Sequence, residues 1–175
     1  NGKDAYHLFE SMPEDLKNNR QTGCQMDLDQ LMRQVTERKY RPGAYAVEYD
    51  RFSFIYQFIA RNVERNGQHV QVVLLSMELP KDREISLERI EDSLVLLESA
   101  IVRSLRRGDV TSRFSSTQQV VVLMDASKED GVMVANRILK KYNTLAKEAA
   151  ITARFDIVEV PHAFSKRTEK NEEKA

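Results

Sequence analysis

The sequence predicts an α+β fold of the ferredoxin-like type: a βαββαβ unit whose antiparallel sheet has helices on one face, preceded by extra N-terminal helices. From residue 70 onward, short runs rich in β-branched residues alternate with segments of helical periodicity in the order β-α-β-β-α-β. Two of these runs are separated by only four polar residues, which is typical of a hairpin. Hydrophobic residues make up 41% of the 175 residues, enough for one core. The fold alone implies no function, because it hosts many unrelated ones.

Composition excludes several classes of protein. Lys plus Arg and Asp plus Glu number 27 each, so no overall field favours nucleic acid. The single cysteine, Cys24, permits neither an intrachain disulfide nor a cysteine zinc site, and it favours a cytoplasmic protein. No apolar run approaches the ~18 residues of a membrane span. No Gly-rich phosphate loop or histidine metal pattern is present, so no cofactor is expected. The chain begins at Asn1 without Met or a signal sequence, which favours a piece of a longer protein.

Residues 1–43 are predicted to form a helical connector. Asp27 can cap a helix from Leu28 to Lys39, and Pro42 with Gly43 ends it. One face of this helix is apolar at the i, i+3, i+4, i+7 spacing, through Leu28, Leu31, Met32 and Val35.

Residues 44–162 are predicted to form the domain. Ala44 to Val47 is expected to be a short extended piece, and Asp50 to Asn66 a helix that Gly67 ends. This helix carries a wide apolar stripe, which favours packing in a core or a dimer over cofactor binding: Phe54, Ile55, Phe58, Ile59 and Val63.

The βαββαβ elements follow in order. Val70 to Leu79 is a strand that Pro80 closes, and Ser86 to Arg106 is a long helix that Gly108 and Asp109 end. The remaining elements are two strands, a helix and a last strand: Val110 to Phe114, Gln119 to Met124, Glu129 to Glu148 and Ile151 to Val160. The charged tail, residues 163–175, is expected to be disordered.

The segment from Arg106 to Leu123 resembles the signature hairpin of the GGDEF family of diguanylate cyclases. In that family an Arg-x-x-Asp motif ends the helix, a strand ends in Arg-aromatic, and Gly-Gly-Asp/Glu-Glu-Phe forms the tip. Arg106 and Asp109 match the first motif, and Arg113 with Phe114 matches the second. The resemblance covers about residues 45 to 160 and implies a nucleotide-cyclase-type sheet.

The signature itself is degenerate. Its positions hold Ser115, Ser116, Thr117, Gln118 and Gln119. The family's divalent metals need carboxylates from the first strand and the signature. The first-strand position falls near Ser76, and Thr117 and Gln118 replace the acidic residues of the signature. Glu78 is the only remaining candidate for a metal ligand. We therefore expect no metal site and no diguanylate cyclase activity.

The Arg-x-x-Asp match implies a second kind of site. In the family it is an inhibitory site for cyclic-di-GMP, and here Arg106 and Asp109 would bind the ligand while Arg103 and Arg113 add positive charge. The simpler alternative is a cationic helix C-terminus with a glycine cap. Glu91 and Asp92 lie near the family's guanine-recognising Asp, and a solvated helix start explains them equally well.

The segment from Gly43 to Asp50 resembles the opening of a degenerate GGDEF subgroup in Firmicute response-regulator-like proteins of two-component signalling. The resemblance implies a receiver or transcriptional-activator domain elsewhere in the parent chain. Three functions remain open: an inactive regulatory and dimerisation module, a cyclic-di-GMP receptor, or a residual enzyme using Glu78. The partners expected are a second copy of the chain and that adjacent domain, without membrane or nucleic acid.

Overall fold

The computed structural model describes residues 27–36, 42–82, 84–146 and 151–161. The chain divides into two compact units, residues 1–40 and 41–175, and each is described by itself. Within the described ranges, no helix has both the length and the apolar character needed to cross a membrane. The predictions for residues 1–26 and for the tail from 163 to 175 lie outside the described residues.

In the first unit, helix α3 spans Leu28–Val35. The predicted cap is present, because the Asp27 carboxylate accepts a hydrogen bond from the Gln30 amide at 2.7 Å. The predicted continuation to Lys39 falls on residues that are not described. The side chains of the apolar stripe are all exposed: Leu28, Leu31, Met32 and Val35.

The second unit is built on a five-stranded sheet with the order β1-β3-β4-β2-β5. The strands are β1 (Tyr45–Ala46), β2 (Gln71–Glu78), β3 (Val110–Arg113), β4 (Gln118–Leu123) and β5 (Thr152–Glu159). The β1–β3 pair is parallel and the other three pairs are antiparallel. Without β1, the order β3-β4-β2-β5 is the split βαβ arrangement that the sequence predicts.

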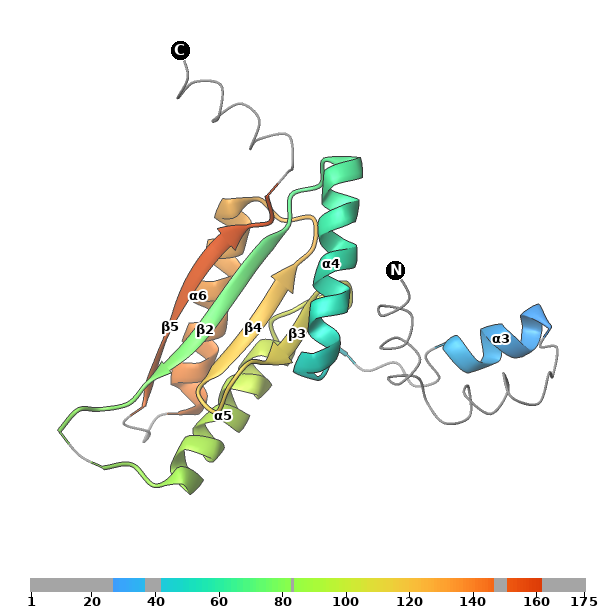
Figure 1. Cartoon of the computed structure of the whole chain (residues 1–175). Helices are drawn as coiled ribbons and strands as arrows, with labels where there is room; N and C mark the ends of the chain where they lie inside the picture. Colours follow the sequence, from blue (N-terminus) through green and yellow to red (C-terminus); the bar gives the residue numbers. More distant parts are fainter. Residues whose placement is uncertain (1–26, 37–41, 83, 147–150, 162–175) are drawn as a thin grey trace, which may run out of the picture. The chain divides into compact units, whose positions relative to one another are not determined.

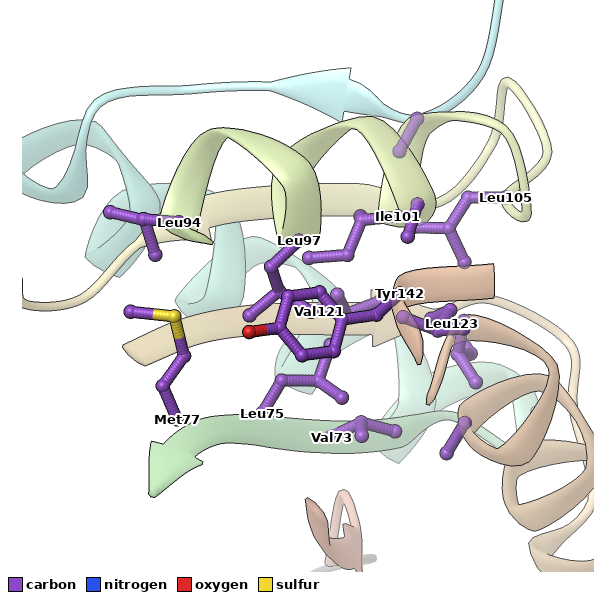
Figure 2. Packing of buried hydrophobic residues seen from close by; sticks show 14 of the residues in the cluster. Val73, Leu75, Met77, Leu94, Leu97, Ile101, Leu105, Val121, Leu123 and Tyr142 are labelled. Carbon is purple, nitrogen blue, oxygen red and sulfur yellow. The ribbon is translucent and has the colours of Figure 1, made fainter. Parts of the chain in front are cut away.

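Helices α5 (Leu87–Val102) and α6 (Lys128–Leu145) cover one face of the sheet, as predicted for the helices of the repeat (Figure 1). Val73, Leu75 and Met77 alternate along β2 and point toward these helices. Figure 2 shows their side chains meeting those of α5, with the fully buried Tyr142 of α6 between them.

Helix α4 (Tyr49–Asn66) lies on the opposite face (Figure 1). Its buried residues Phe52, Ile59 and Val63 form a second, smaller cluster with apolar residues of β3 and β4 and with the residues that flank β2 and β5, Val70 and Val160. Both faces of β4 are therefore buried, which explains its nearly unbroken run of valines.

Helix α5 ends at Val102, earlier than the predicted Arg106. Leu105 fits the helical period and is buried, yet it lies in the turn after the helix. The Arg137 and Lys141 side chains of α6 donate hydrogen bonds to the carbonyls of Ser104 and Arg103. These cations satisfy carbonyl groups at the end of α5, which stabilises the early end.

Candidate functional site

Ser76 and Gln118 lie opposite each other on β2 and β4. The Gln118 side-chain amide donates a hydrogen bond to the Ser76 hydroxyl at 3.0 Å. Ser76 is 6% exposed and Gln118 is of intermediate exposure, so this contact is partly buried. At two positions where the resemblance places carboxylates, a neutral hydroxyl and a neutral amide therefore satisfy each other.

The β3–β4 hairpin is closed by its own polar groups. The Thr117 amide donates to the Ser115 hydroxyl at 3.2 Å, and that hydroxyl donates to the Gln118 side-chain oxygen at 3.5 Å. The Phe114 amide donates to the Gln118 carbonyl at 2.9 Å, and the Met77 amide of β2 donates to the Thr117 carbonyl at 2.8 Å. Ser115, at the first of the two glycine positions, thus helps to order the hairpin tip.

Glu78 has a cationic partner from β5. Its carboxylate lies 3.2 Å from the Arg154 Nε atom, and both side chains are about half exposed. Arg154 also bonds the carboxylate of Asp156. The one carboxylate that the sequence leaves near the family's metal position is therefore paired with an arginine, which it shares with Asp156. Among the described residues, no cluster of His, Cys, Asp and Glu forms a metal site.

Gln119 occupies the last signature position and is almost fully buried. Its side-chain amide donates to the Glu98 carboxylate of α5 at 2.7 Å. This contact ties the hairpin strand to the helix that crosses behind it.

Arg113 and Glu91 form a bidentate ion pair with N–O distances of 2.8 and 2.7 Å. The hydrogen bonds from Arg113 hold the pKa of the Glu91 carboxyl below its ordinary value. Arg113 also donates to the Ser115 carbonyl at 3.3 Å. The Arg113 guanidinium group thus links α5 to the hairpin. Glu91, its partner on α5, lies near the position where the resemblance places guanine recognition.

The Arg106–Asp109 loop is closed on itself. The Arg106 amide donates to one oxygen of the Asp109 carboxylate at 2.8 Å, and the Met124 amide donates to the other at 3.2 Å. Asp109 is 6% exposed, whereas Arg106 and Arg103 are exposed. The carboxylate of the Arg-x-x-Asp motif therefore caps backbone amides, and the arginine side chains face solvent.

Strand β1 lies directly against this loop. The Tyr45 amide donates to the Asp109 carbonyl at 2.7 Å, and the Val47 amide donates to the Thr111 carbonyl at 3.0 Å. The chain reaches this point through Gly43, which is packed against the end of α5 with a φ of +88°.

The structure brings the predicted residues together in two groups. Ser76, Glu78 and Gln118 meet at one end of β2, while Arg106 and Asp109 lie in the loop that follows α5. Sequence analysis missed Arg154 and Glu98, the charged partners of this region. Arg154 could have been found from the pairing of the last strand with the first, because Ser76 and Arg154 are register partners.

Comparisons with known proteins bear on the fold. No protein-family model and no curated protein matches the sequence. Among solved structures, a DGC protein from Thermotoga maritima is 15% identical with a TM-score of 0.55, covering 75% of this chain and 95% of its own.

Two further solved structures are similar. The diguanylate cyclase SiaD from Pseudomonas aeruginosa, in complex with its activator SiaC, is 17% identical with a TM-score of 0.57 over 95% of this chain and 68% of its own. The GGDEF domain of DgcB from Caulobacter crescentus, in complex with c-di-GMP, is 11% identical with a TM-score of 0.51 over 71% of this chain and 80% of its own. These likenesses establish that the chain has the fold of GGDEF diguanylate cyclase domains.

Proposed function

We propose, with the GGDEF domain fold as the premise, that this chain is a noncatalytic signalling module. The observation that carries the proposal is the hydrogen bond between Gln118 and Ser76, at the place where a cyclase of this fold holds its metals. Two nucleotide triphosphates bring many negative charges, and divalent cations held by carboxylates are needed to offset them. A hydroxyl and an amide supply no negative charge. The Glu78 carboxylate is already in an ion pair with Arg154.

The test is a cyclase assay on the purified chain with GTP and Mg²⁺ or Mn²⁺. We expect no cyclic-di-GMP above the blank, while an active diguanylate cyclase serves as the positive control. Turnover that disappears in the Glu78→Ala variant would instead support a residual enzyme with a single-carboxylate metal site.

Self-association through helices is the second part of this proposal. Phe54 and Phe58 lie one turn apart on α4 and are 58% and 68% exposed. Tyr49, at the start of α4, packs edge-on against Phe114 with ring centroids 5.1 Å apart, and both residues remain about half exposed. An apolar surface of this kind favours burial against another protein. We propose that α4, together with the apolar stripe of α3, supports a homodimer.

Cyclic-di-GMP binding is the alternative function, favoured by the exposed arginines beside the Arg106–Asp109 loop. Because the Asp109 carboxylate is engaged by backbone amides, we expect Arg106 to carry the contact with the ligand. Titration calorimetry with cyclic-di-GMP tests this function. Arg106→Ala should weaken binding by roughly tenfold or more, the loss of one charged hydrogen bond. If the wild-type chain binds no cyclic-di-GMP, the loop has only the structural role of a helix cap.

The module is proposed to act in the cytoplasm of a bacterium, next to a receiver or transcriptional-activator domain of a two-component signalling protein. Without turnover, its output would be a contact with such a domain or with a second copy. The sequence of the parent gene product tests this placement directly.

A further inference from the structure

Strand β5 is an edge whose outer side has no strand beside it among the described residues. It pairs with β2 along its whole length, from Thr152 to Glu159, without a break in register. Figure 1 shows it as the outermost long strand of the sheet. Such an edge presents a row of backbone donors and acceptors that can template pairing with another strand.

The backbone groups that face the open side can be identified. The Val160 amide donates to the Val70 carbonyl at 2.8 Å, so at this position the backbone of the β5 segment faces β2. Because backbone direction alternates along an antiparallel ladder, even-numbered residues of β5 face β2. The amides and carbonyls of Ala153, Phe155 and Ile157 therefore face outward.

The strand has few of the features that protect sheet edges. It contains no proline or glycine, and its pairing with β2 shows no bulge. Charged side chains also protect edges, because they repel a second copy of the same strand. Here Arg154 and Asp156 have opposite charges two residues apart, so the charge pattern can complement itself.

We propose that β5 pairs antiparallel with β5 of a second copy of this chain, with Phe155 on the two-fold axis. In this register Arg154 lies opposite Asp156 of the second copy, and the reverse holds by symmetry. These are non-hydrogen-bonded pairs, in which cross-strand side chains approach most closely. Both side chains are exposed, at 52% and 62%, and within one chain they already form an ion pair with each other, which the cross-strand pairs would replace or extend.

The charges also disfavour the two neighbouring registers. Centring the pair on Arg154 would set two guanidinium groups opposite each other, and centring it on Asp156 would set two carboxylates opposite each other. Like charges in directly opposite positions destabilise an antiparallel pair. The register centred on Phe155 avoids both arrangements.

The other face of the strand is compatible with the same register. Ala153, Phe155 and Ile157 are partly buried against the α5–α6 core and keep an exposed remainder. In the proposed pair, Phe155 lies against its own copy and Ala153 against Ile157 of the second copy. The pairing would cover apolar surface on one face while it joins charges on the other.

The test uses two charge-reversal variants of the full chain, Arg154→Asp and Asp156→Arg, each made in a parent chain that carries Phe58→Glu, so that the α4 contact does not contribute. Sedimentation velocity measures the association, and the parent chain should reach the dimer mass at ~100 µM. Each variant alone should dimerise roughly tenfold or more weakly, because two symmetry-related pairs change from opposite to like charges. An equimolar mixture of the two variants should regain the dimer, since one chain then offers two carboxylates to two guanidinium groups on the other.

A matched control is Glu88→Arg on the exposed surface of α5, which changes the net charge as Asp156→Arg does and should leave the dimer unchanged. Amide hydrogen exchange gives a second readout. The amides of Ala153, Phe155 and Ile157 should exchange more slowly in the parent chain than in either variant. Association through α4 would not protect these amides. A monomeric parent chain, variants that dimerise as well as this parent, or a mixture that stays monomeric would each overturn the proposal.

Discussion

Ser76 and Gln118 add one neutral side-chain hydrogen bond, in a partly buried position, to the backbone ladder that joins β2 and β4. A carboxylate at each position would place like charges directly across an antiparallel pair, which is unfavourable unless a cation lies between them. The chemistry of the site thus depends on two side chains, and this can be tested by replacing them.

The double variant Ser76→Asp/Gln118→Glu should lose about 1 kcal/mol or more of unfolding free energy without divalent cations, through like-charge repulsion and the lost hydrogen bond. Added Mg²⁺ or Mn²⁺ should restore stability, because a cation that binds only the folded state stabilises it. Thermal unfolding with and without metal measures both effects. The wild type is the control and should show no metal dependence, and a double variant equally indifferent to metal would contradict the idea that these positions can form a cation site.

Asp109 is a structural residue by its contacts, because both of its oxygens accept backbone hydrogen bonds. Asp109→Ala would leave the Arg106 and Met124 amides without these acceptors. We expect a loss of about 2 kcal/mol in urea-induced unfolding, the cost of stranding shielded donors. Asp109→Asn keeps one oxygen and should lose less. Arg106→Ala removes only an exposed side chain and should change stability by less than ~0.5 kcal/mol. Equal stability of Asp109→Ala and wild type would show that the loop needs no cap.

At the scale of single elements, the connection into β1 is sterically fixed. A Cβ atom at Gly43 would lie 2.4 Å from the Val102 carbonyl oxygen, and the backbone there has a φ of +88°. Gly67, which ends α4, also has a positive φ but has no atom within 4 Å of a Cβ position. An alanine at Gly67 would therefore meet only backbone strain, whereas an alanine at Gly43 would meet both backbone strain and a steric clash.

Gly67→Ala should cost about 1 kcal/mol, the penalty of the left-handed conformation alone. Gly43→Ala should cost clearly more, because the carbonyl of α5 must also move. Chemical denaturation of both variants gives the comparison. If Gly43→Ala is no more destabilising than Gly67→Ala, the chain enters β1 along a different path.

The elements also show what periodicity can and cannot predict. The order of strands and helices follows from the sequence, because each run has a clear period of 2 or 3.6. The end of α5 does not, since buried Leu105 continues the helical period after the helix has ended. The pairs Arg113–Glu91 and Gln119–Glu98 were also missed, because they join residues far apart in the chain. Such contacts depend on strand register and helix placement, which sequence periods do not fix.

At the scale of the whole molecule, the sequence predicted the helices of the repeat but not that α4 would bury the other face of the sheet. This second layer turns Phe54 and Phe58 outward, because Phe52, Ile59 and Val63 already fill the contact with the sheet. The stripe predicted from sequence is thus divided between a core side and an exposed side.

If α4 supports a homodimer, Phe58→Glu should lower the association constant roughly tenfold or more, because it places a charge in an apolar contact. Light scattering over a concentration series measures the effect. Ser53→Glu adds the same charge to another exposed side of α4 and serves as the control. Identical association of Phe58→Glu and wild type would exclude this face as the interface.

The parallel pairing of β1 with β3 has a mechanical consequence. Tension on the chain at residue 42 reaches the domain through Gly43 and is then borne by the hydrogen bonds that join β1 to the carbonyls of Asp109 and Thr111. A force along the strand shears these bonds together and does not open them one at a time. These hydrogen bonds are therefore the first contacts of the sheet to carry a displacement of residue 42, and the exposed Arg106 lies in the same loop as Asp109.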